Sequence, residues 1–144
     1  MTAEPELLEH LWAAQDALLA ALDEQSDLGE VAKGIGHPVA IEPDHVWITG
    51  RATGKVDSEL SGATAPGDEE FRLTVVIYTQ LADEYTVVRD RLKGFATAVG
   101  AAMASAGVAA IVPAWTVADF TLDEGTDGTY RQLSLELTFA CQCW

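Results

Sequence analysis

The feature that most constrains the fold is a strict alternation of apolar and polar residues near the C-terminus. In residues 129 to 143 one face of the alternation consists of Leu133, Leu135, Leu137, Phe139, Cys141 and Cys143. Residues 71 to 80 alternate in the same way, with Phe71, Leu73, Val75 and Ile77 on one face. Successive side chains of a strand point to opposite faces, so both segments are predicted to be strands with one buried face. A sheet of this kind must cover its apolar face with a second layer.

Two segments have the apolar spacing of helices that could form this layer. Residues 5 to 23 begin with Pro5, which suits a first helical position, and their predicted apolar stripe is Leu7, Leu8, Leu11, Trp12, Leu18, Leu19 and Leu22. A second helix is predicted to be capped by Asp83 and to end near Gly107. Its inward stripe is Tyr85, Val88, Leu92, Phe95, Val99 and Met103.

The remaining segments complete a mixed architecture. Weak strands are predicted at 39–41 and 46–49, separated by the turn-like EPDH, and another strand at 114–122 is joined to the last one by a turn at DEGTDG, residues 123 to 128. Residues 51–70 contain three glycines and few large apolar groups, which predicts a long exposed loop. The order predicts one α+β domain over residues 1–144, with a mainly antiparallel sheet and two principal helices packed on one face.

Charge excludes several classes of partner. The 144 residues contain 23 Asp and Glu against 8 Lys and Arg, a formal net charge of -15. Such a surface repels phosphate, so specific nucleic-acid binding and attachment to an anionic membrane are disfavoured. Residues 94–118 carry no charged side chain, but they are mostly Ala, Gly, Ser and Thr and include Pro113, which argues against a membrane span. No secretion signal is recognised at the N-terminus.

Two loops invite comparison with ligand-binding motifs. GRATGK, residues 50 to 55, follows a predicted strand, but its glycines are too close for a phosphate-binding loop and Val56 stands where such a loop has Ser or Thr. In DEGTDG, calcium binding by Asp123, Glu124 and Asp127 is conceivable, although their spacing does not match an EF-hand. An ordinary hairpin turn is the preferred interpretation.

The thiols and imidazoles give no clear catalytic or metal centre. Cys141 and Cys143 lie on one strand face, too far apart for a relaxed disulfide, and His10, His37 and His45 do not stand at ligand spacing from them. His45 follows Asp44, but adjacent residues of a strand point to opposite faces. The sequence therefore predicts no catalytic residue, no metal, no cofactor and no enzymatic activity.

The order of elements resembles the tail terminator proteins of long-tailed bacteriophages over nearly the whole chain. The likeness rests on an Ala/Leu-rich first helix, HVWITG at 45–50, a long polar insertion leading to EEFRLTVVIYT at 69–79, the helix with RDRLKGFATAVGAAM at 89–103, a strand ending at Leu122, and the final YRQLSLELTFACQCW. EVAKGIGHP at 30–38 does not match the pattern, which leaves the first strand open.

The resemblance implies a structural virion protein that assembles in the host cytoplasm. It implies a ring, typically a hexamer, at the head-proximal end of the tail, where it caps the tail tube, stops polymerisation and offers a surface for head-tail joining at the neck. Its partners would be other copies of itself, the tube protein and neck or head completion proteins. DNA would pass through the ring without specific binding, and an anionic lumen would keep it from sticking. The alternatives are another neck or tail completion protein and a small ligand-binding α+β domain.

A ring or tube contact is expected in the long loop. Because its glycines leave the backbone permissive and few apolar groups could anchor it, ordering this segment needs a partner surface. The cations would meet carboxylates of the next subunit. The candidate interface residues are Arg51, Lys55, Val56, Asp57, Glu59, Leu60, Asp68 and Glu69.

Overall fold

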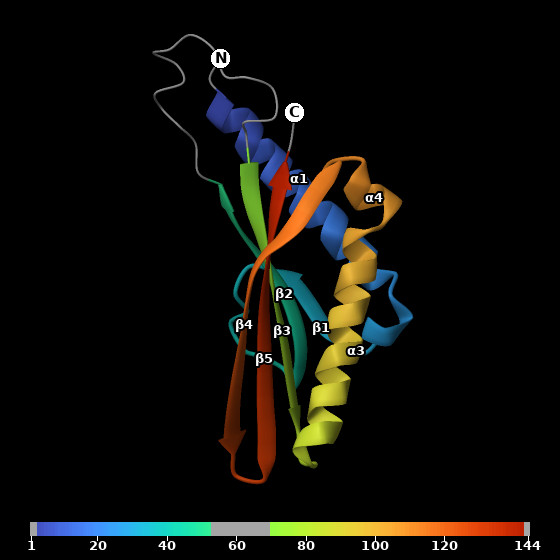
Figure 1. Ribbon diagram of the computed structural model, residues 1–144, viewed down its shortest axis with the longest axis vertical. Coiled ribbons are helices and arrows are strands. Elements are labelled where there is room, and N and C mark those ends of the chain that lie inside the picture. The colour runs from blue at the N-terminus through green and yellow to red at the C-terminus, as the bar shows by residue number, and fades with distance from the viewer. Residues whose placement is uncertain (1–2, 53–69, 143–144) are drawn as a thin grey trace.

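The computed structural model describes residues 3–52 and 70–142, and it has a single five-stranded sheet with two main helices on one face (Figure 1). The helices are α1 (Ala3–Asp23), α3 (Tyr85–Met103) and the short α4 (Ala106–Ala109), and a 3-10 turn, η1, covers Ser26–Leu28. The strands are β1 (Ala32–Ile35), β2 (Asp44–Ala52), β3 (Glu70–Leu81), β4 (Ala114–Asp127) and β5 (Tyr130–Gln142). The predicted α+β class is confirmed.

The sheet has the order β1-β2-β3-β5-β4, and all neighbouring pairs are antiparallel except β1 and β2. The alternation of β3 is confirmed, because Phe71, Leu73, Val75 and Ile77 are all buried against the helices. On β5, Leu133, Phe139 and Cys141 are buried, while Leu135 and Leu137 are only partly buried at the margin of the core. The middle of β5 is therefore covered less fully than the segments on either side of it, at Leu133 and at Phe139 and Cys141.

Helix α1 lies close to β2 because a glycine leaves room for it. A Cβ atom on Gly50 would come within 2.6 Å of Leu11 Cδ1 and 2.8 Å of Gln15 Nε2. The buried side of α1 consists of Leu11, Ala14, Leu18, Ala21 and Leu22. The predicted stripe was too broad: Leu8 is 38% exposed and Trp12 is 55% exposed, since only one side of the helix can face a sheet.

Helix α3 packs on β3 and β5, with Val88, Leu92, Phe95, Val99 and Met103 buried as predicted and Tyr85 half-buried. The prediction that Asp83 caps it was wrong. Glu84 occupies the capping position, and the Asp83 carboxylate instead accepts a hydrogen bond from the Glu84 amide at 2.7 Å. The helix also ends earlier than expected, and Ser105 starts α4 by accepting a hydrogen bond from the Val108 amide.

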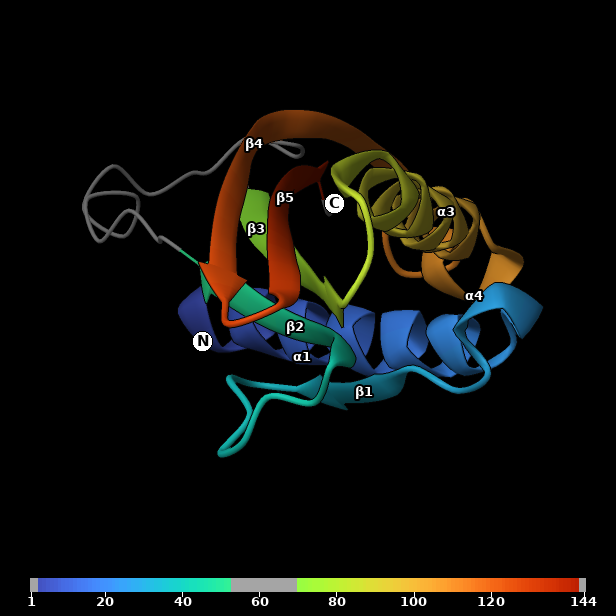
Figure 2. The ribbon, with the colours of Figure 1, turned by 90° about the horizontal axis from the view of Figure 1, so that it is seen from below.

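The first edge of the sheet differs from the prediction. Residues 39–41 are not a strand; the edge strand is β1, which runs parallel to β2. A parallel pair requires the chain to return along the strands before it can re-enter the sheet, so residues 36–43 form the crossover (Figure 2). Pro38 and Pro43, which lack an amide hydrogen, flank the segment that resembled a strand.

The crossover covers the face of the sheet opposite the helices. The ring of His37 lies 5.5 Å from that of Trp47, and Trp47 alternates along β2 with the core residues Val46 and Ile48. Trp47 and His45 are consequently buried although they point away from the core.

The hairpin between β4 and β5 is longer than expected. DEGTDG is not the turn, because β4 continues through Asp127, which pairs with Tyr130. The chain reverses at Gly128 and Thr129, and Gly128 has φ +62°. A two-residue hairpin loop favours such a left-handed glycine, whereas the acidic residues before it retain strand pairing.

Candidate functional site

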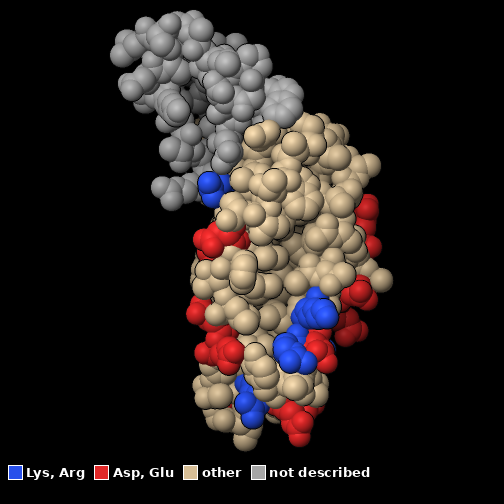
Figure 3. Space-filling view, in the orientation of Figure 1, with Lys and Arg blue, Asp and Glu red and all other residues tan. Residues whose placement is uncertain are grey.

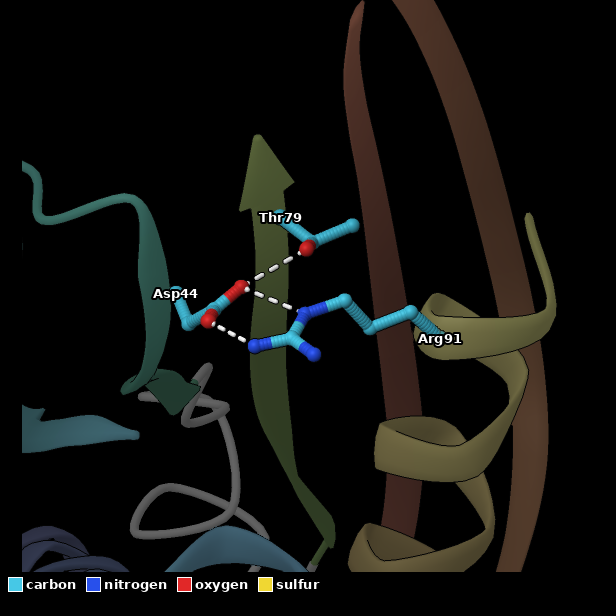
Figure 4. A network of polar contacts seen from close by, with 3 residues as sticks. All are labelled: Asp44, Thr79 and Arg91. Atoms are coloured by element: carbon cyan, nitrogen blue, oxygen red, sulfur yellow. Dashed lines mark hydrogen bonds and ion pairs between the residues drawn. The ribbon is translucent and has the colours of Figure 1, made fainter. Parts of the chain in front are cut away.

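The most connected polar cluster joins two strands to α3 (Figure 4). Asp44 begins β2 and accepts a hydrogen bond from Thr79 Oγ1 at 2.7 Å. Arg91 of α3 binds both carboxylate oxygens of Asp44, with its Nε 3.1 Å from Oδ1 and its Nη2 paired with Oδ2. The guanidinium also lies 5.2 Å from the ring centre of Phe95. This bidentate ion pair holds the N-terminal half of α3 against the sheet.

The interactions within this cluster move the pKa values of Asp44 and Arg91 further from neutral pH. Partial burial raises the pKa of Asp44, but the hydrogen bonds from Arg91 and Thr79 and the charge of Arg91 together lower it below its ordinary value. The hydrogen bond to Asp44 raises the pKa of Arg91, against the lowering effect of desolvation. A general acid or base works best with a pKa near the operating pH, so these shifts fit a structural ion pair.

His45 has a structural contact on the other side of the sheet. Its Nδ1 accepts a hydrogen bond from the Glu42 amide at 3.0 Å, and its ring meets Trp47 edge-on at 5.4 Å. The Asp44 carboxylate points instead to Arg91 and Thr79, as expected for neighbouring strand residues. The geometry thus separates the two residues that the sequence places side by side.

The described parts of the two loop motifs, GRATGK and DEGTDG, lie largely in strands. Gly50, Arg51 and Ala52 of GRATGK are paired with β3, and the rest of that motif lies outside the described residues. Within DEGTDG, Asp123 pairs with Ser134 and Glu124 with Leu133, so their carboxylates start from opposite faces of the sheet. In the described ranges 3–52 and 70–142, no three His, Cys, Asp or Glu side chains gather as a metal site would require.

The thiol of Cys141 is buried, and its Sγ donates a hydrogen bond to the Phe139 carbonyl oxygen at 3.7 Å. Its predicted neighbour Cys143 lies outside the described residues. Among the helices of the described chain, none is both long and apolar enough to cross a membrane.

A hollow of ≈ 260 Å³ lies between the start of α3 and the β4–β5 hairpin. It is open to solvent, and three of its polar side chains are paired: Tyr85 donates to Glu124 Oε1 at 3.0 Å, and Arg131 Nε donates to the Asp83 carbonyl at 3.0 Å. The hydrogen bond to Glu124 is the main cause that raises the pKa of Tyr85, which moves this phenol further from neutrality. The hollow therefore offers little for acid–base chemistry.

The edge strand β4 carries a set of exposed apolar side chains, here called the edge surface: Val117, Phe120 and Leu122. Phe120 is 66% exposed and pairs across the hairpin with Leu137, and Leu122 pairs with Leu135. The set starts from the helix-covered side of the sheet, but α1 and α3 pack mainly on the other strands, and these three side chains of β4 stay exposed. An edge strand with uncovered apolar groups is a typical protein-binding feature.

A second exposed apolar set lies at the other edge of the sheet. The name connection surface is used here for Ile35 at the end of β1, which pairs with the core residue Ile48 and starts from the helix-covered face, together with Val39 and Ile41 in the crossover on the opposite face; their exposures are 41%, 107% and 46%. Two of its members were predicted to be strand residues, and the crossover instead turns them to solvent. The chain thus has apolar surfaces at both edges of one sheet.

Charged groups surround uncharged surface on the face over β4 and α3. In Figure 3 the acidic side chains lie along the margins and the lower end of this face, and a broad uncharged area covers α4 and the upper part of β4. The sequence explains this area, because residues 94–118 contain no Asp, Glu, Lys or Arg. Residues 94–118, whose lack of charge raised the question of a membrane span, run through the end of α3, α4 and the start of β4.

Only one residue of the interface predicted in the long loop lies among the residues that the structure describes. Arg51 lies in β2 opposite Arg72, and Lys55, Val56, Asp57, Glu59, Leu60, Asp68 and Glu69 lie outside the described residues. The edge and connection surfaces were missed, because an alternating apolar residue on an edge strand has the same sequence pattern as one in the core.

No protein-family model matches the sequence, and no curated protein matches it. What defines its class is the fold itself: one α+β layer pair with exposed apolar side chains at the edges of its sheet.

Proposed function

We propose that this protein is a structural virion component of a long-tailed phage. In this proposal, a ring of copies caps the completed tail tube, stops further tube polymerisation and presents a surface to the neck of the head. It resides at the head-proximal end of the tail. The particular role is proposed because the order of elements resembles that of tail terminator proteins.

The observation that carries the proposal is the edge surface on β4. Phe120 is 66% exposed and Val117 is 52% exposed, on a strand whose outer backbone edge has no partner within the described chain. Monomeric proteins rarely leave apolar side chains clustered on a sheet edge, because that edge invites pairing with other chains. A protein that works by assembling on a polymer end requires surface of this kind.

Charge supports the same function. Copies with a net charge of -15 repel one another in dilute solution, so they remain dispersed until a specific surface holds them together. In a ring around the DNA path, the same carboxylates repel phosphate and let the genome pass without binding.

The function is tested by adding the purified protein to tail tubes during polymerisation of the tube protein. We expect short tubes with density at one end in electron micrographs, and no effect from an equal amount of an unrelated acidic protein. Tubes that grow to the same length with no end density would reject the proposal. Binding to isolated necks or heads without binding to tubes would favour another neck completion protein.

A further inference from the structure

The outer edge of β4 is open for pairing with another strand. β4 is the last strand in the sheet order, and no strand within residues 3–52 and 70–142 pairs with its outer side (Figure 1). From Asp119 to Asp127 it pairs with β5 without a register shift, so its backbone stays regular over this stretch. β4 also lacks lysine and proline, with which many proteins block the edge of a sheet. This edge can therefore accept an extended strand by main-chain hydrogen bonds.

One face of β4 is apolar along this edge. Because of the register shift between Val117 and Asp119, the three side chains of the edge surface all lie on the helix-covered face, where their partners on β5 are Leu135, Leu137 and Phe139. The exposed side chains of the edge surface therefore form a single row. A strand added beside β4 covers this row only if apolar residues occupy its alternate positions.

The other face of the same stretch is acidic. Asp119, Asp123 and Asp127 pair with even-numbered residues of β5, so they start from the face of the sheet opposite the helices. Glu136 of β5 is exposed on that face as well. Neither β4 nor the even-numbered residues of β5 include a Lys or Arg. An added strand meets these carboxylates with the residues that alternate with its apolar ones.

Charge selects the occupant of the edge. A second copy of β4 would bring the same carboxylates onto one shared face, and like charges facing each other across strands are destabilising, whereas opposite charges stabilise the pair. The other strands of a second copy fit no better, because each carries a single cation: Lys33, Arg51, Arg72 and Arg131. The edge therefore suits a strand of a different protein.

We infer that β4 accepts, as an additional strand of the sheet, an extended segment of another protein in which apolar residues alternate with Lys or Arg. The apolar side chains of this segment cover Phe120 and Leu122 on one face, and its cations face Asp119 and Asp123 on the other. The inference rests on the proposed function, because it names the chemistry of the partner that binds the edge surface. The net charge of -15 also attracts a cationic segment from a distance.

The inference is tested with a synthetic peptide of about ten residues in which Lys alternates with Val, by fluorescence anisotropy. We expect saturable binding, and at least about tenfold weaker binding of two matched peptides. One has Glu in place of Lys, and the other has Pro in place of two central Val residues, which keeps the charge but removes backbone donors. Equal binding of either matched peptide overturns the inference, and so does no saturable binding of the Lys–Val peptide up to about 1 mM.

Charge variants of the protein test the acidic face. The double variant Asp119→Asn, Asp123→Asn should bind the Lys–Val peptide about three- to tenfold more weakly, because two opposite-charge pairs are lost at an exposed site. The control is Asp27→Asn with Glu30→Gln, which removes two exposed carboxylates elsewhere and leaves the same net charge. An equal loss in both double variants would show attraction by net charge alone and overturns the inference.

Hydrogen exchange and an apolar variant locate the contact. Peptide binding should slow exchange of the amide protons of β4 and leave those of α1 unchanged, and Phe120→Ser should weaken binding about tenfold while Leu8→Ser, at an exposed leucine of α1, does not. Protection that excludes β4 overturns the inference. So does protection of β4 that grows with protein concentration in the absence of peptide, because a second copy would then occupy the edge.

Failure of this contact and failure of the proposed function give different results. Binding of the Lys–Val peptide to β4, combined with no effect of the protein on growing tail tubes, upholds the contact and rejects the tail terminator function. Normal capping of tubes by the wild type and by Phe120→Ser, combined with no peptide binding, upholds the function and rejects the contact.

Discussion

At the scale of single residues, Asp44 connects the parts of the fold that meet at the lower end of the sheet. Its carboxylate receives hydrogen bonds from Thr79 of β3 and Arg91 of α3. Asp44→Asn should lower the free energy of unfolding by about 1–2 kcal/mol at pH 7, the lower part of the range for hydrogen bonds to charged groups because Arg91 is partly exposed. Urea denaturation measures the loss, and the exposed Asp27→Asn is its control.

The same pair predicts a pH dependence. The pKa of Asp44 is lowered in the folded chain, so its contribution is fully present above the ordinary Asp pKa of about 3.9 and is lost as the pH falls through the lowered value. The stability difference between the wild type and Asp44→Asn should therefore shrink as the pH is reduced below about 4. A difference that stays constant down to about pH 2 would contradict this assignment.

Two glycines predict opposite effects of the same substitution. Gly50→Ala should destabilise the chain by about 1–3 kcal/mol, because the added methyl group meets Leu11 and Gln15 at under 3 Å and overpacks the contact between α1 and β2. Gly94→Ala in α3 meets nothing within 4 Å and should stabilise the helix by about 0.5–1 kcal/mol. Thermal unfolding of both variants checks the prediction, and equal signs would contradict it.

At the scale of elements, β5 should show a graded response to truncation. Phe139→Ala should lower the free energy of unfolding by about 3–5 kcal/mol, because the ring is buried and packs edge-on to Trp115. Leu137→Ala should cost less, about 1–3 kcal/mol, because this leucine is only partly buried beside Phe120. Glu136→Ala should stay within about 0.5 kcal/mol. Equal losses at all three positions in a denaturant series would show that β5 is packed differently.

The elements with strong periodicity were predictable from the sequence, and those defined by long-range pairing were not. The alternation of β3 and β5 and the stripes of α1 and α3 reflect burial against a neighbour, which the sequence records locally. β1 has only four residues, Ala32–Ile35, with a glycine among them, and it is a strand only because β2 lies beside it. Val39 and Ile41 have the apolar spacing of a short strand, but their backbone lies in the crossover that connects β1 to β2.

The candidate site was predictable only in part, for a related reason. The sequence correctly separates Asp44 from His45, because strand geometry alone places them on opposite faces. The partnership of Asp44 with Arg91 joins residues 47 positions apart, and no local pattern encodes it. Likewise, the exposure of Phe120 depends on how far α3 reaches across the sheet, which is a property of packing.

At the scale of the whole molecule, the net charge predicts how assembly responds to salt. Copies of charge -15 repel one another, and raising the ionic strength from about 0.01 M to about 0.15 M shortens the screening length from about 30 Å to about 8 Å. Self-association should therefore strengthen with added salt, as measured by sedimentation. Association that weakens with salt would indicate a contact dominated by ion pairs.

The long hairpin of β4 and β5 also bears on how quickly the chain reaches its fold. Its strands are joined by only Gly128 and Thr129, so this pairing closes the shortest loop in the sheet, whereas the β1–β2 pair must wait for a crossover. The hairpin should therefore be formed early, in the transition state of folding. Gly128→Ala, which strains a φ of +62° by about 1 kcal/mol, should then slow refolding about fivefold and leave the unfolding rate nearly unchanged.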